Sequence, residues 1–172
     1  MYRGITVSEP ELAMRTENTR DRRHLAIFRV LWRHFEIVAN ACIANGGRIA
    51  IEWPRACRYW RNRRVASFLK RHGCMQYKFD GCMYNLRSQC GQSRGNLLRK
   101  PWTIASNCSS FQRLCRVCNH DRAVEPHAPT QGGDTRLTES YTDSMVERIH
   151  SCWRHGYHHD TTNDDTTTTP QH

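Results

Sequence analysis

The feature that most constrains this fold is a long amphipathic helix predicted over residues 21–44. Apolar side chains recur there at steps of three and four residues, and arginines occupy the opposite face. The apolar stripe comprises Leu25, Phe28, Leu31, Phe35, Val38 and Cys42. The sequence Asn45-Gly46-Gly47 follows, with residues that tolerate the left-handed conformation of a helix C-cap. The pattern therefore predicts that the helix ends there.

Shorter elements follow this helix. Apolar runs bounded by glycine and proline predict strands over residues 48–53, 74–80 and 101–106. Helical periodicity predicts further helices over residues 60–72, 109–115 and 138–153, with loops at 81–100 and 118–135. Helices that alternate with short strands indicate an α/β fold, here a partial Rossmann-like parallel sheet of about three strands with flanking helices.

The polar ends of the chain contrast with this middle part. Residues 1–20 show no sustained period and are predicted to be a disordered lead-in, and residues 158–172 form a Thr-, Asp- and His-rich tail that is also predicted to be disordered. A single α/β domain is therefore predicted over residues 21–157.

The cellular compartment is predicted from what the sequence lacks. No stretch approaches the roughly 20 apolar residues that cross a bilayer, and the N-terminus has no apolar signal-peptide core. The nine cysteines are an odd number, which argues against a secreted disulfide scaffold. We expect an intracellular protein, cytoplasmic or nuclear, that is neither secreted nor bound to a membrane.

The charge of the chain points to a polyanionic partner. The 26 Lys and Arg residues against 16 Asp and Glu residues leave a net charge of +10. Most of the positive charge is arginine, whose planar guanidinium suits bidentate phosphate contact and stacking on bases. We expect nucleic acid as the partner; the alternative is a basic surface that only keeps the protein soluble.

One segment combines these charges with aromatic side chains. Arginines with interleaved aromatics suit phosphate contact together with base stacking. The predicted nucleic-acid-binding residues are Arg55, Arg58, Tyr59, Trp60, Arg61, Arg63, Arg64, Lys70 and Arg71. The alternative is a solvated helix face whose aromatic side chains point into the core.

A cysteine and histidine cluster near residue 118 suggests a metal site. A Cys-x2-Cys pair is a common half-site for tetrahedral zinc, and nearby histidines can complete it. The predicted ligands are Cys115, Cys118, His120 and His127. The alternative is that these cysteines are unligated and pack as small hydrophobic residues.

Glu52 is the candidate catalytic residue. It stands near the end of the first predicted strand, followed by Trp53 and Pro54. In open α/β sheets ligands bind beyond the carboxyl ends of the strands, so a carboxylate there is placed to face a crevice. The alternative is an exposed glutamate paired with a nearby arginine.

Several short motifs occur in a fixed order along the chain. They are Gly46-Gly47, Ile51-Glu52-Trp53-Pro54, Phe79-Asp80-x-Cys82-Met83-Tyr84, Lys100-Pro101-Trp102, Ser106-Asn107 and Cys118-Asn119-His120. Over residues 22–155 this series resembles the second half of cytosine-5 DNA methyltransferase-like domains of phages and mobile elements. The resemblance implies that Glu52 contacts a target cytosine, although Trp53 replaces the asparagine typical of that family.

The chain also departs from this family. It contains no Pro-Cys pair to supply the nucleophile, and nothing before residue 46 forms the Gly-rich turn that holds S-adenosylmethionine. The resemblance therefore implies a truncated or degenerate copy that binds nucleic acid without catalysis. Two alternatives remain: a nucleic-acid or protein-binding module stabilised by structural zinc, and an enzyme of another class that uses Glu52. A half-sheet would also leave an open edge for a partner chain.

Overall fold

The computed structural model describes the backbone of residues 9–161 and the side chains of residues 21–157. The chain divides into two compact units, Met1–Gly47 and Arg48–His172. The boundary falls inside the stretch 21–157 that the sequence predicts as one domain.

The described part of the first unit forms the helix α1 (Glu9–Ala44). Its C-terminal end is as predicted: Gly46 has a φ of +74°, and the Gly47 N–H donates to the Cys42 carbonyl at 2.8 Å. Its N-terminal end differs, because the helix begins within the predicted lead-in. Pro10 falls in the first turn, where a missing N–H costs no helical hydrogen bond. Residues 1–8 lie outside the described part.

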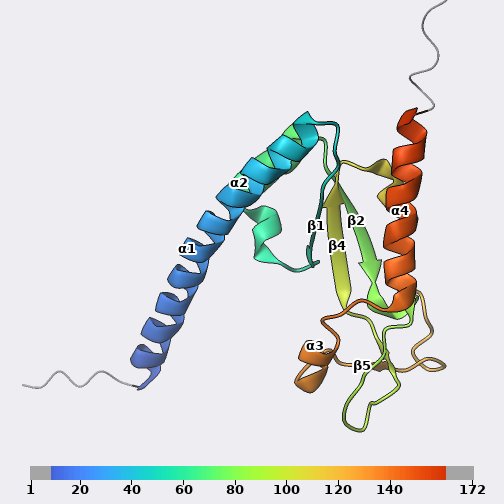
Figure 1. Ribbon diagram of the computed structural model, residues 1–172. Helices are drawn as coiled ribbons and strands as arrows, with labels where there is room; N and C mark the ends of the chain where they lie inside the picture. The colour runs from blue at the N-terminus through green and yellow to red at the C-terminus, as the bar shows by residue number, and fades with distance from the viewer. Residues whose placement is uncertain (1–8, 162–172) are drawn as a thin grey trace, which may run out of the picture. The chain divides into compact units, whose positions relative to one another are not determined.

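The second unit is built on a three-stranded sheet in the order β1-β4-β2. These strands are β1 (Ala50–Pro54), β4 (Pro101–Ser106) and β2 (Met75–Asp80), and they lie side by side in Figure 1. The mixed α/β class and the three strands are confirmed. Both pairings are antiparallel, however, so a Rossmann-like parallel sheet is not confirmed. Alternating apolar residues identify a strand but not the direction of its neighbour.

The register decides which side chains share a face of this sheet. Glu52 on β1 lies opposite Ile104 on β4, and Ile104 lies opposite Tyr77 on β2. Residues that pair directly across an antiparallel ladder project to the same side. Glu52 is therefore on the same face as Ile104 and Tyr77, two residues of the hydrophobic core.

The helix α4 (Asp143–Thr161) covers this face (Figure 1). Its fully buried Met145 and Cys152 belong to the same core as Phe79 and Trp102 of the sheet. Helix α4 starts later than predicted and extends into the tail predicted to be disordered; residues 162–172 lie outside the described part.

Short elements fill the remaining connections of the second unit. They are η1 (Arg58–Arg61), α2 (Arg63–Arg71), η2 (Gly81–Tyr84), β3 (Leu97–Leu98), η3 (Ser109–Leu114), β5 (His127–Ala128) and α3 (Gly133–Leu137). Strands β3 and β5 form a separate parallel pair. Both segments predicted as loops, 81–100 and 118–135, therefore contain short elements that their lack of periodicity did not indicate. Among the helices of the described part, none has both the length and the apolar character needed to cross a membrane.

Candidate metal centre

Four side chains with metal-binding atoms converge at the edge of the core in the second unit. They are Cys82, Cys118, His120 and His127, and their ligand atoms all lie within 4.8 Å of one another. Cys82 lies on η2, directly after β2, and His127 lies on β5, where pairing with β3 fixes its place. Cys118 and His120 belong to the segment between them. This cluster could hold a metal ion.

The distances within the cluster fit a tetrahedral ion. The Cys118 Sγ lies 3.5 Å from His120 Nδ1 and 3.5 Å from His127 Nε2. With ordinary Zn–S and Zn–N bond lengths, the sulfur–nitrogen edge of a tetrahedron is about 3.6 Å and the sulfur–sulfur edge about 3.8 Å. The widest separation in the cluster, at most 4.8 Å, closes with a shift of about 1 Å.

The outer nitrogen atoms of both histidines lie near Glu125. His127 Nδ1 lies 2.9 Å from the Glu125 carbonyl oxygen, a contact in which the ring donates and Nε2 keeps its lone pair toward Cys118. His120 Nε2 lies 3.8 Å from the Glu125 carboxylate. Metal-binding histidines ordinarily donate their second N–H to a carbonyl or a carboxylate. The Glu125 carbonyl therefore orients His127, and the Glu125 carboxylate lies at ion-pair distance from His120.

Asp80 connects the cluster to the sheet. It is fully buried at the end of β2, and its Oδ2 accepts a hydrogen bond from the Cys118 backbone N–H at 2.9 Å. Arg55 and Arg99 form ion pairs with the same carboxylate at 2.7 and 3.1 Å. These contacts hold Cys118 and the start of η2 against the strand before any metal binds.

The environment of Cys82 keeps its thiol protonated when no ion is present. Burial, together with smaller contributions from the adjacent Cys118 and Asp80, raises the pKa of Cys82 to about 12. A metal ion is the strong positive charge that stabilises a thiolate in such a place.

The predicted ligand set needs one correction. Cys118, His120 and His127 come together, but Cys115 is not in the cluster: it caps the end of η3 and packs against the hydrophobic core. Cys82 takes the remaining place. It lies far upstream in the chain, and its only sequence signal is a cysteine directly after a predicted strand.

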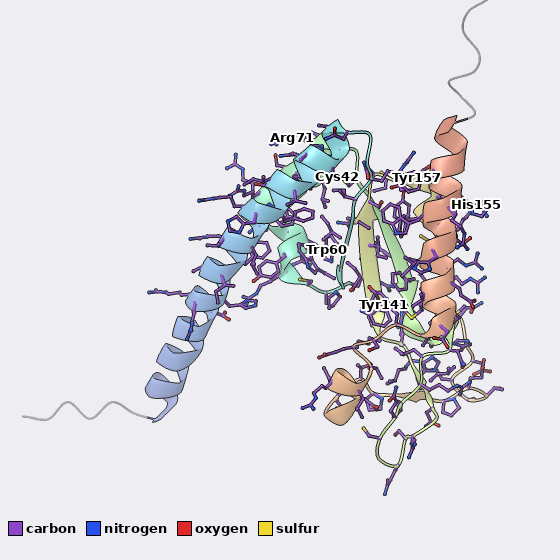
Figure 2. All side chains as sticks on the ribbon, viewed as in Figure 1. Cys42, Trp60, Arg71, Tyr141, His155 and Tyr157 are labelled. Atoms are coloured by element: carbon purple, nitrogen blue, oxygen red, sulfur yellow. The ribbon has the colours of Figure 1, made fainter. Side chains whose placement is uncertain are left out.

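Glu52 lies within β1, on the core-facing side of the sheet. Its Oε2 accepts a hydrogen bond from the Tyr141 hydroxyl at 2.9 Å, whereas its Oε1 is buried without a hydrogen-bond partner in the described residues. Tyr141 lies beside the start of β4 (Figure 2), where its ring contacts Trp102 at 5.8 Å. Burial raises the pKa of Glu52, although Tyr141 and Lys100 oppose the shift.

Burial also shifts the pKa values of two groups near Glu52, Tyr141 and Lys100. Burial also raises the pKa of Tyr141, and the adjacent Glu52 charge adds to this rise. Burial lowers the pKa of Lys100, and the negative charges of Glu139 and Glu52 partly oppose this lowering. The Lys100 ammonium donates a hydrogen bond to the Thr138 carbonyl. The three groups form a polar cluster at the rim of the core rather than an exposed strand end.

The predicted nucleic-acid-binding residues occupy different environments. Six of them are exposed on η1 and α2, and we call this set the α2 basic face: Arg58, Arg61, Arg63, Arg64, Lys70 and Arg71. Arg55 is instead engaged with Asp80. Tyr59 and Trp60 are half-buried and pack on Trp53, with ring centroids 5.8 and 4.7 Å away, and the Trp60 Nε1–H donates to the Pro54 carbonyl.

Comparison with known proteins adds no relative. No family model matches the chain, and no curated protein or solved structure is significantly similar to it.

Proposed function

We propose that this protein is a nucleic-acid-binding module whose fold is stabilised by a structural zinc ion. The observation that carries the proposal is the convergence of two thiols and two imidazoles, with donor atoms within 4.8 Å, from separate parts of the chain. Two cysteines and two histidines are a common donor set of structural zinc sites. Such a closed set leaves no position for a reacting water, which favours a structural over a catalytic ion.

The nucleic-acid part of the proposal rests on the α2 basic face. No acidic residue occurs between residues 53 and 79, so the segment that carries this surface is purely basic in its charged residues. Helix α2 buries Val65, Phe68 and Leu69 on one side, which leaves its basic residues on the other. The side chains of Arg63 and Arg71 are exposed at opposite ends of the helix, about 12 Å apart along its axis, so this face is long enough to contact more than one phosphate of a backbone.

The direct test measures binding of a fluorescent single-stranded oligonucleotide at several salt concentrations. The wild-type chain should bind. A plot of the logarithm of its binding constant against the logarithm of salt concentration should have a slope of about −0.7 for each phosphate contact. Neutralising Arg61, Arg63, Lys70 and Arg71 to glutamine should weaken binding by at least about tenfold and flatten this slope.

A charge-matched control separates the α2 basic face from net charge. The residues Arg22, Arg23, Arg29 and Arg33 on α1 are also exposed, and changing them to glutamine removes the same charge. The proposal predicts a much smaller loss in this variant. Equal losses in both variants would show that only net charge matters, and no binding by the wild-type chain would overturn the proposal.

The resemblance to cytosine-5 methyltransferases supports a second candidate function, in which Glu52 contacts a cytosine base. One observation favours it: the buried Oε1 of Glu52 has no hydrogen-bond partner in the described residues, and burial raises the pKa of this carboxyl. A protonated carboxyl can donate a hydrogen bond to a ring nitrogen.

This second proposal predicts binding that depends on pH and on cytosine. Affinity for a cytosine-rich oligonucleotide should be higher below the pKa of Glu52 and fall as the pH rises through it. Glu52→Gln should remove this dependence, and a thymine-rich oligonucleotide of equal length serves as the control. The same pH profile for wild type and Glu52→Gln would rule out this role.

A further inference from the structure

A cavity of about 480 Å³ lies between α4 and the segments that carry the two cysteines of the metal cluster. One wall is a stripe of α4 with helical spacing: Ser144, Glu147, Arg148 and Ser151. The other wall consists of Met83, Tyr84, Asn85 and Arg116. The volume is within the range of sites that enclose a small ligand.

Two arginines, Arg116 and Arg148, contribute positive charge to the lining of this cavity. The Arg116 guanidinium lies over the Tyr84 ring, 5.7 Å from its centroid, and Arg148 lines the same space from α4. Among residues 21–157, neither arginine has a carboxylate partner at ion-pair distance. Two guanidinium groups that line one cavity without an ion-pair partner favour a phosphate, which they can bind through paired N–H donors.

The remaining groups suit a larger ligand than a bare anion. Asn85 has its Oδ1 held by the Arg87 Nε–H at 2.7 Å, which turns its amide N–H groups away from Arg87. Glu147 adds one carboxylate to the lining and can accept hydrogen bonds from a sugar hydroxyl or from a base N–H. A cavity with two cations, amide donors, hydroxyl groups and one carboxylate matches a phosphate attached to a sugar and a base.

We infer that this cavity binds one nucleotide, with its phosphate on Arg116 and Arg148 and its sugar or base near Glu147. The inference deepens the proposed nucleic-acid function and rests on it. The cavity lies on the second unit, next to the metal cluster in the chain. Met83 and Tyr84 in its lining directly follow Cys82, and Arg116 lies two residues before Cys118. The Asp80 N–H donates to the Arg116 carbonyl at 2.8 Å, so the metal cluster and the cavity share their supports.

The test compares two double variants with equal charge. Arg116→Gln with Arg148→Gln removes both cations of the cavity, whereas Arg113→Gln with Arg154→Gln removes two exposed arginines on η3 and α4 that do not line it. Binding of a labelled oligonucleotide should weaken by about tenfold in the first variant, with a salt slope smaller by about 0.7, the contribution of one phosphate. The second variant should bind like the wild type.

A third variant changes the affinity in the opposite direction. Glu147→Gln removes the negative charge of the lining, so phosphate binding should strengthen by about threefold. Glu139→Gln, an exposed acid outside the cavity, serves as its control and should change nothing. This pair of variants keeps the test decisive if the double arginine variant loses its fold.

Competition identifies the source of the phosphate. A nucleoside 5′-monophosphate, inorganic phosphate, and oligonucleotides with and without a 5′-phosphate are each titrated against the labelled oligonucleotide. Preference for the 5′-phosphorylated strand indicates a chain end, and equal affinity of both strands indicates an internal phosphodiester; each supports the inference. If the wild type binds but the cavity variants bind equally well, the cavity assignment alone is wrong. If the wild type does not bind, the proposed function falls with it.

Discussion

At the scale of single residues, Glu52 joins the sheet to the segment before α4. Its Oε2 accepts the Tyr141 hydrogen bond, and its other oxygen is buried beside the core. Burial disfavours the charged carboxylate, so the folded chain prefers the protonated form more than the unfolded chain does.

This preference predicts a pH dependence of stability. A raised pKa in the folded state contributes stability that is fully present below the unfolded value of about 4.5 and is lost as the pH rises through the folded pKa. Glu52→Gln, which can still accept the Tyr141 hydrogen bond, should unfold at the same urea concentration as wild type at low pH and at a higher one at neutral pH. A difference that does not change with pH would contradict this account.

Substitution of Asp80 should lower the free energy of unfolding more than the other substitutions considered. Asp80 is fully buried, and Arg55, Arg99 and the Cys118 N–H all bind its carboxylate. Asp80→Ala should lower the free energy of unfolding by about 2 to 4 kcal/mol, because it removes the carboxylate partner of two arginines and the hydrogen-bond acceptor of the part-buried Cys118 N–H. Arg94→Ala, an exposed arginine, is the control. Equal urea midpoints for the two variants would show that this network is not important for stability.

At the scale of elements, α2 depends on Asn62, the N-cap residue that directly precedes it. The Asn62 side chain accepts hydrogen bonds from the backbone N–H groups of Arg64 and Val65, at 3.0 and 3.5 Å. Asn62→Ala should therefore lower the free energy of unfolding by about 1 kcal/mol, whereas Asn62→Asp, which preserves the cap, should change it little. Urea unfolding monitors both variants, and an equal loss would contradict the capping role.

The elements also show which parts of the fold can be read from sequence. The strand at residues 101–106 and the C-terminal end of α1 follow from local signals, a proline-bounded apolar run and a glycine cap. The antiparallel pairing does not, because the alternation of side chains is the same for either strand direction.

The metal cluster illustrates the same limit for a site. Cys118, His120 and His127 are close in the chain, so their spacing identifies them. Cys82 joins them only because β2 and η2 end beside this segment, a tertiary arrangement that no local pattern encodes. Cys115 satisfied the expected Cys-x2-Cys spacing but packs into the core instead.

At the scale of the whole molecule, the metal should determine how stable the second unit is. An ion that binds only the folded state at a thousand times its dissociation constant adds about 4 kcal/mol. Adding a chelator should therefore lower the melting temperature by roughly 10 °C, and restoring zinc should reverse the change. Magnesium provides the control, because it prefers oxygen ligands. A melting temperature that the chelator leaves unchanged would argue against a structural ion.

The zinc content of the purified wild-type chain, Cys82→Ser and Cys115→Ser tests the central claim most directly. Elemental analysis should find about one zinc per wild-type chain, the same in Cys115→Ser, and a strong reduction in Cys82→Ser, because two thiolates and two imidazoles complete the tetrahedral set. Absence of zinc from the wild type, or its loss from Cys115→Ser with retention in Cys82→Ser, would contradict the account.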